Sequence, residues 1–397
     1  MVSLKSILNP WICGSLCWLG TLACAEAQDF PIIQKLYPDD AEVFPSGEII
    51  TVGFGTHLAL DGNTLMASEP ESVPPRVVVF TRSGASAPWT RTATVYISTA
   101  PSYLWDYHSS KLALDGDIAL IGSPRTVHVL HRVGRNWQEI QRIKPPSPDG
   151  VQSFPRTLAF DGGVAVITGA SSTEGIAYVY EAQPSGRLAL KARLRSLTGS
   201  PGDGFGESAA LHSGTIAIGA PGVKSVFVFK RSGSTWKRIQ QVMPVEVGSA
   251  QTFGTAVAVD GNTLVVGAPE ALSEGNEGER QNGAAYVFGL SEGAYAQKSV
   301  LHPEEYSGYT DYGRIVKLTS DRLLVSAVVE HIDGPYYGPG LSFTYTRSGS
   351  AVHLLGVASD DFDPWDMVTD GTQLVVSDGG FRYAIGSAYV FDIRKPN

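Results

Sequence analysis

Short hydrophobic runs separated by tight polar turns occupy most of the chain, and their order repeats. In the clearest copy, residues 256–259 form an apolar run, and Asp260-Gly261-Asn262 follows as a turn because Gly and Asn tolerate positive φ. Residues 264–266 form the return run, which stops at Pro269 because proline cannot donate a hydrogen bond to a β-ladder. Residues 283–288 then form a third run with alternating faces. The pattern predicts three consecutive strands joined by turns.

The same phrase recurs in seven copies along the chain. The hairpin positions are Asp61, Asp115, Asp161, His212, Asp260, Thr319 and Asp370, with a period of 46 to 59 residues. Each of the first six copies is followed by a fourth strand-like run, which often opens with Trp, as at Trp89, Trp137 and Trp236. The seventh copy has no fourth run before Asn397.

An isolated run at residues 32–37 offers the missing strand. Its Q-K-L-Y-P at 34–38 is similar to Q-R-I-K-P at 141–145 in a fourth run. Closing a ring in this way removes the open sheet edges that invite aggregation. The sequence therefore predicts an all-β fold, a seven-bladed β-propeller of four-stranded blades, closed by an N-terminal strand that completes the last blade. Residues 28–50 are assigned to the N-terminal segment with the closing strand, and residues 51–397 to the repeats.

The repeated phrase Phe-Gly, then Gly-Ala-Pro, then Gly-Ala-Ala-Tyr-Val-Phe resembles the FG-GAP repeat of integrin α-chain propellers and of many exported bacterial proteins. The resemblance is strongest in copies four and five. It implies an extracellular binding module of the cell-adhesion type. Small glycines should let neighbouring blades approach closely. The aromatic residues expected where blades meet are Phe54, Phe154, Phe205, Phe253 and Tyr312.

Calcium is implied by the resemblance but disfavoured by the residues. Integrin-type repeats often carry an Asp-rich calcium loop between the first and second strands, because hard cations need several converging oxygens. Here that hairpin shrinks to Asp-Gly-Asn-Thr or less, as at residues 260–263. We therefore expect no calcium at the hairpins and no other cofactor.

The first 27 residues have the pattern of a signal peptide. Lys5 precedes an apolar stretch at residues 11–23, and Ala25-Glu26-Ala27 fits a cleavage site. Cys13, Cys17 and Cys24 all fall in this segment, so the mature chain should contain no disulfide. We expect export to the periplasm, the cell surface or the medium, with an uncleaved anchor or a lipoprotein as alternatives. No other apolar run is long enough to span a bilayer.

Composition and charge narrow the kinds of partner. Charged residues make up 17% of the chain and glycine is abundant at 44, which suits short strands and tight turns. The net charge is −9, and no window of the sequence is strongly basic, so nucleic acid is not expected as a partner. We expect a monomer.

The long connections gather on one face of a propeller, and we expect function there. This long-loop face carries the connections between second and third strands and those between blades. Aromatic and acidic residues crowd its blades six, seven, one and two, and exposed Tyr and Trp are typical of binding surfaces, although they could instead pack the channel mouth. The predicted ligand-binding residues are Tyr103, Trp105, Tyr107, Tyr309, Tyr336, Tyr337, Asp361, Trp365 and Tyr383.

Three functions remain open from the sequence. The first is a non-enzymatic module that binds an extracellular protein or glycan through the long-loop face. The second is a polysaccharide hydrolase or lyase, with Asp361 and Asp366 as the carboxylate pair. The third is a structural scaffold in an envelope assembly. The acidic stretch at residues 274–279 is expected to be a solvated loop, with a cation site as the alternative.

Overall fold

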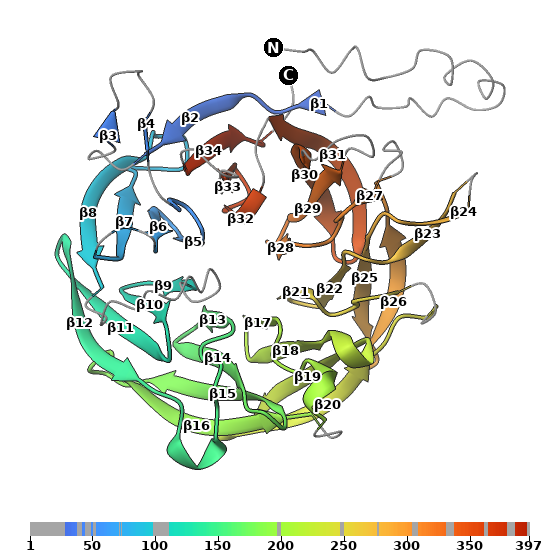
Figure 1. Ribbon diagram of the computed structural model, residues 1–397, viewed down its shortest axis with the longest axis horizontal. Coiled ribbons are helices and arrows are strands. Elements are labelled where there is room, and N and C mark those ends of the chain that lie inside the picture. The colour runs from blue at the N-terminus through green and yellow to red at the C-terminus, as the bar shows by residue number, and fades with distance from the viewer. Residues whose placement is uncertain are drawn as a thin grey trace.

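The computed structural model is a closed ring of seven four-stranded antiparallel blades (Figure 1), which confirms the predicted fold. The structure describes residues 28–37, 42–43, 49–50, 53–70, 72, 74–97, 111–196, 200–246, 250–275, 278–303, 309–330, 337–360, 364–378 and 386–394. The proposed signal peptide lies outside these residues. No α-helix occurs in the described ranges, and the 3-10 turns there are η2 (Ser147–Asp149), η3 (Pro201–Asp203) and η4 (Pro221–Val223).

In each blade the first strand lies nearest the central axis and the fourth is outermost (Figure 1). Blade 1 holds β5 (Leu58–Asp61), β6 (Thr64–Glu69), β7 (Arg76–Thr81) and β8 (Thr90–Tyr96). Blade 2 holds β9 (Leu112–Asp115), β10 (Ile118–Ser123), β11 (Thr126–Val133) and β12 (Asn136–Ile143). Blade 3 holds β13 (Leu158–Asp161), β14 (Val164–Ala170), β15 (Gly175–Ala182) and β16 (Leu188–Arg195). Blade 4 holds β17 (Ala209–His212), β18 (Thr215–Ala220), β19 (Ser225–Ser232) and β20 (Thr235–Val242).

The other three blades follow the same order with additions. Blade 5 holds β21 (Ala256–Asp260), β22 (Thr263–Ala268), β25 (Ala284–Ser291) and β26 (Ala294–Leu301). Blade 6 holds β28 (Val316–Leu318), β29 (Arg322–Glu330), β30 (Tyr337–Ser348) and β31 (Ala351–Asp360). Blade 7 holds β32 (Pro364–Thr369), β33 (Gln373–Asp378), β34 (Ser387–Asp392) and β2 (Ile32–Leu36). The further strands are β1 (Gln28–Asp29), β3 (Glu42–Val43), β4 (Ile49–Ile50), β23 (Leu272–Gly275), β24 (Gly278–Gln281) and β27 (Tyr309–Thr310).

The N-terminal segment closes the ring as predicted. Strand β2 pairs antiparallel with β34, placing Lys35 opposite Tyr389 and Leu36 opposite Ala388. Just before it, β1 pairs in parallel with β31 of blade 6, where Gln28 lies opposite Gly356. The closing segment therefore ties blades 6 and 7 together as well as completing blade 7.

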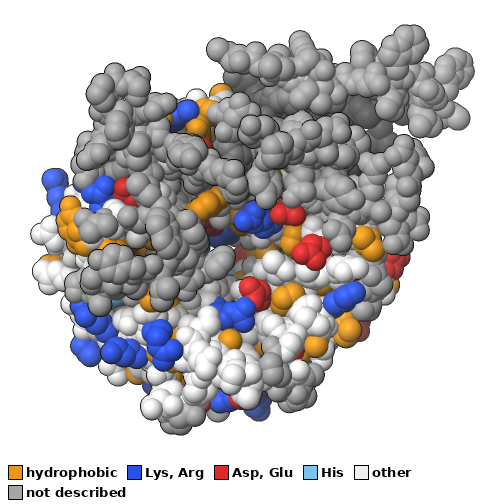
Figure 2. Space-filling view, viewed as in Figure 1, with side chains coloured by type: hydrophobic (Ala, Val, Ile, Leu, Met, Phe, Trp, Pro, Cys, Tyr) orange, Lys and Arg blue, Asp and Glu red, His pale blue; other side chains and the backbone are white. Residues whose placement is uncertain are grey.

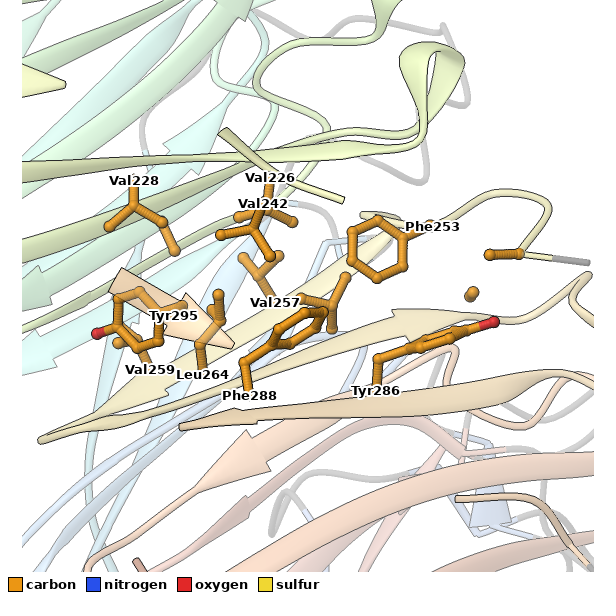
Figure 3. Close-up of a cluster of buried hydrophobic side chains, with 14 of the residues drawn as sticks. Val226, Val228, Val242, Phe253, Val257, Val259, Leu264, Tyr286, Phe288 and Tyr295 are labelled. Atoms are coloured by element: carbon orange, nitrogen blue, oxygen red, sulfur yellow. The ribbon is translucent and has the colours of Figure 1, made fainter. Parts of the chain in front are cut away.

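The hydrophobic core lies between blades. The buried side chains of the described residues form seven clusters, each shared by two neighbouring blades. Successive side chains of an inner strand point to opposite faces of the blade and so pack against both neighbouring blades. Val257 of β21 packs toward blade 4 and Ala258 toward blade 6. Figure 3 shows the cluster between blades 4 and 5, in which Val226 and Val228 face Leu264 and Phe288.

The repeated aromatic residues lie in these clusters, as the sequence predicts. Phe253 is fully buried and meets Phe288 edge-on, with ring centroids 6.0 Å apart. The glycine at the end of the second strand lies directly against the next blade. A Cβ on Gly267 would lie 1.9 Å from the carbonyl oxygen of Gly313 in blade 6. The five aromatic residues Phe54, Phe154, Phe205, Phe253 and Tyr312 are all buried.

The hairpins between the first and second strands form what we call the short-turn face, where the Asp residues join neighbouring blades. A carboxylate oxygen of Asp61 accepts the N–H of Gly116 at 2.8 Å, and one of Asp115 accepts that of Gly163 at 2.6 Å. Asp260 pairs with His212 at 3.1 Å. The hairpin carboxylates therefore connect neighbouring blades through hydrogen bonds and ion pairs.

One sequence prediction about local structure is wrong. The composition of residues 274–279 predicts a loop, but strands β23 and β24 pair as a β-hairpin, with Glu274 opposite Glu279. The hairpin extends from blade 5, and β24 lies beside β27 of blade 6. Blade 5 therefore carries the additional strands β23 and β24, and blade 6 carries the additional strand β27.

Candidate functional site

Three of the predicted ligand-binding residues lie in the described part of the chain. These are Tyr309 in β27, Tyr337 in β30 and Trp365 in β32. The other six fall outside the described residues: Tyr103, Trp105, Tyr107, Tyr336, Asp361 and Tyr383.

The structure brings the two described tyrosines together in blade 6. Glu330 of β29 lies opposite Tyr309 of β27 on one side and opposite Tyr337 of β30 on the other. Neighbouring strands lie about 5 Å apart, so the three residues form one row across the sheet. The row lies where β29 and β30 meet the long-loop face, since the connection between these second and third strands belongs to that face. Strand register therefore brings the backbone positions of Tyr309 and Tyr337 to either side of Glu330, and their use as a binding site stays a prediction.

Trp365 lies on a different element, at the start of the innermost strand of blade 7. Its side chain is half-buried, and the next residue, Asp366, links three blades. One carboxylate oxygen of Asp366 is 3.1 Å from Nζ of Lys317 in β28. The other accepts the N–H of Leu58 at 2.9 Å and lies 4.0 Å from Nδ1 of His57. Blades 6, 7 and 1 therefore meet at this carboxylate, near the long-loop end of the central channel.

The surroundings of Asp366 keep it ionised. Burial by itself raises the pKa of this carboxyl, but Lys317, His57 and the Leu58 N–H together outweigh burial and hold the pKa below its ordinary value. A carboxylate held in this form is a poor proton donor for a leaving group. The geometry therefore does not favour Asp366 as the general acid of a glycosidase.

Further charged residues surround the mouth of the channel. Arg156 precedes the innermost strand of blade 3 and forms an ion pair with Glu207, which precedes that of blade 4. In blade 6, Arg314 lies 4.0 Å from Asp311. Side chains of both signs are visible around the middle of the face seen in Figure 2. The mouth therefore offers both donors and acceptors to a polar ligand.

Sequence reasoning missed these mouth residues, although a signal existed. Arg156, Glu207 and Arg314 each lie two positions after the repeated aromatic residue, at Phe154, Phe205 and Tyr312. The same position holds Thr255 in blade 5. When the copies are aligned on this aromatic residue, the position two residues later holds a charged side chain in blades 3, 4 and 6 and a threonine in blades 1 and 5.

A second missed group lies inside blade 2. Ser123 Oγ is 2.9 Å from Nε2 of His128, and Nδ1 of His128 is 3.0 Å from Glu139 Oε2. The order of contacts is that of a hydrolase triad, but Ser123 is only 5% exposed and His128 only 1%. By strand register, His128 takes the position of Phe227 in blade 4. The group is therefore a satisfied polar substitute for a core aromatic.

Within the described ranges, no three His, Cys, Asp or Glu side chains come together to hold a metal ion. The same part of the chain contains no helix long and apolar enough to cross a membrane.

Comparison with known proteins adds a family match for one repeat. The FG-GAP repeat family matches residues 236–288, from the outer strand of blade 4 through the third strand of blade 5. A search of curated proteins found no match.

Two solved structures are similar in fold. A protein from Lactobacillus plantarum is 14% identical with a TM-score of 0.48, covering 77% of this chain and 85% of that one. Sqt1 from Saccharomyces cerevisiae is 10% identical with a TM-score of 0.53, covering 93% of this chain and 100% of that one. At this identity the likeness to Sqt1 concerns the fold alone.

Proposed function

We propose that this FG-GAP repeat β-propeller is an exported, non-enzymatic interaction module. It binds an extracellular protein or glycan through the long-loop face, in the sector that runs from blade 6 through blades 7 and 1 to the connection into blade 2. The main support for this proposal is that the two faces of the ring differ in what their residues do. The hairpin carboxylates of the short-turn face, such as Asp61 and Asp115, are used to join blades. The long-loop face instead receives the added strands of blades 5 and 6 and the row of Tyr309, Glu330 and Tyr337.

Export is supported by the family resemblance and by the sequence before the ring. Cleavage after Ala27 would leave Gln28 as the first residue, and Gln28 opens strand β1. The mature chain would then begin directly with the segment that ties blade 6 to blade 7.

A binding role without catalysis fits the chemistry of the described residues. Asp366 is engaged by Lys317 and the Leu58 N–H, which leaves it a poor acid catalyst. We also propose that the hairpins hold no calcium, because Asp61 and Asp115 direct oxygens at backbone N–H groups. Binding should therefore be unchanged by a chelator such as EDTA.

A direct test uses the mature chain in a glycan array and in a pull-down from extracellular fractions. The triple change Trp105→Ala, Tyr337→Ala and Trp365→Ala should abolish binding, because it removes aromatic contact area from the proposed sector. Trp137→Ala, at the short-turn end of β12, is the matched control and should leave binding intact.

Three outcomes would count against the proposal. Undiminished binding by the triple variant would contradict the site. Loss of binding in EDTA would contradict the calcium-free hairpins. Steady turnover of a polysaccharide would favour the hydrolase or lyase alternative.

A further inference from the structure

A groove of about 590 Å³ lies between blades 2 and 3 on the long-loop face. One wall is the turn between β10 and β11, and the other is the connection from β12 into blade 3. The walls include Pro124, Arg125, Lys144, Pro145, Pro146 and Gln152. Volumes of this order are typical of small-ligand sites and can hold a short peptide segment. The groove is separate from the sector of blades 6, 7 and 1.

Arg125 occupies an unusual backbone position in this groove. Its φ is +59°, at the second position of the two-residue turn Pro124-Arg125, where glycine or asparagine is ordinarily preferred. The turn is held because the Arg125 N–H donates to the carbonyl of Phe154 at 2.8 Å, and its Nη1 donates to that of Gln152 at 3.0 Å. A non-glycine residue at positive φ carries backbone strain, and such strain is consistent with a functional role for the Arg125 side chain.

The groove combines two exposed cations with an absence of carboxylates. Lys144 is exposed and forms no ion pair with any described residue. No Asp or Glu among the described residues lines the groove. The nearest acid in the sequence, Asp149, is only 8% exposed and accepts from Arg193 and Arg195 at 3.0 Å each. The field inside the groove is therefore positive.

The part of the ring around the groove is also positively charged. Residues 111–246, which cover blades 2 to 4, contain 16 Lys or Arg and 10 Asp or Glu, whereas the rest of the chain contains 14 and 29. Figure 2 shows Lys and Arg side chains gathered over the part of the ring where β12 and β16 lie in Figure 1. An acidic partner would be drawn to this side and repelled from blades 6 and 7.

The wall residues distinguish between kinds of anion. Sugar rings are ordinarily held by stacking on aromatic side chains, and none lines this groove. Pro124, Pro145 and Pro146 instead offer flat apolar surfaces beside the two cations. We propose that the groove is a second binding site, which takes an extended acidic peptide segment, with Arg125 and Lys144 pairing with its carboxylates.

Fluorescence anisotropy with labelled deca-glutamate tests this site. In about 50 mM salt the peptide should bind the wild-type chain, and binding should weaken at about 300 mM as screening grows. The double variant Arg125→Gly, Lys144→Gln should raise the Kd by about tenfold or more. Glycine suits the positive φ at position 125, so the fold should be retained, and a thermal melt checks this.

The matched control is Lys230→Gln, Lys237→Gln, which removes the same charge from an exposed cross-strand pair outside the groove. Its Kd should change by less than about threefold. Equal losses in both double variants, or no binding by the wild type, would overturn the proposal. Preference for a sulfated hexasaccharide over deca-glutamate would overturn the choice of a peptide. The triple variant of the blade 6, 7 and 1 sector should bind deca-glutamate normally, so the two proposed sites can fail separately.

Discussion

At the scale of single residues, the absence of a side chain sets how closely blades approach. A Cβ on Gly219 would lie 2.0 Å from the carbonyl oxygen of Gly254, and one on Gly267 would lie 1.9 Å from that of Gly313. Both contacts join the second strand of one blade to the Phe-Gly or Tyr-Gly of the next. The repeated glycine is therefore a packing requirement between blades, in keeping with its place in the motif.

Gly267→Ala should destabilise the chain by about 1–3 kcal/mol, because the added methyl group must displace the backbone of blade 6. Gly84→Ala is the matched control, since a Cβ there meets nothing within 4 Å, and it should change stability by less than about 0.5 kcal/mol. The midpoint of urea unfolding measures both. Equal midpoints for the two variants would show that the blades can separate without cost.

At the scale of elements, a repeated glutamine clamps outer strands to one another. Gln34 Nε2 donates to the carbonyl of Trp89 at 2.8 Å, and the Trp89 N–H donates to Gln34 Oε1 at 2.9 Å. Gln141 makes the same pair of bonds with Leu188. Gln240 makes it with Tyr295. The closing strand β2 therefore uses the same device as the ordinary fourth strands of blades 2 and 4.

Gln34→Ala should cost about 1–3 kcal/mol, because it removes two hydrogen bonds and leaves backbone groups of Trp89 without their partner. Gln138→Ala, an exposed residue of β12, is the control and should have little effect. Thermal unfolding compares them, and hydrogen exchange should rise first in β2 and β34 of the Gln34 variant. Protection of β2 equal to that of the wild type would argue that the clamp does not hold the ring closed.

At the scale of the whole molecule, ion pairs join the blades on either side of the closure. Asp366 links β32 to Lys317 in blade 6 and to Leu58 in blade 1. On the short-turn face, Asp370 of blade 7 pairs with Arg82 of blade 1. The pKa of Asp370 is also lowered, since hydrogen bonds from Gln373, Arg82 and Thr372 outweigh its burial. The closure is thus supported by charge at both ends of the channel.

Asp366→Asn should lower the melting temperature at neutral pH. The folded-state pKa of Asp366 is lowered, so its contribution is present above the unfolded pKa of about 3.9 and is lost as the pH falls through the folded value. The difference in melting temperature between wild type and variant should therefore shrink below about pH 4. Asp117→Asn removes a pair whose carboxylate is 58% exposed and should have a small effect. A difference that is the same at pH 3 and pH 7 would contradict this account.

Much of the fold could be predicted because its signals are local. The Asp-Gly-Asn hairpin and the Pro after Gly-Ala are each a few residues long. The similarity of residues 34–38 to 141–145 likewise rests on five positions in each segment. The blade contacts could not be predicted in detail. His128 replaces a core aromatic only because strand register aligns it with Phe227, and the β23–β24 hairpin forms in a stretch whose composition favours a loop. The sequence assigned both Tyr309 and Tyr337 to blade 6, but only strand register sets them on either side of Glu330.

The sequence alone determined the number of blades, the order of their strands and the strand that closes the ring. Alternating side chains and turn residues act over a few positions, so each copy specifies its own blade. The tertiary structure decided which distant charges meet. His57, Lys317 and Asp366 come together, and Arg125 and Lys144 share a groove, because ring closure and strand register fix distances that no local pattern encodes.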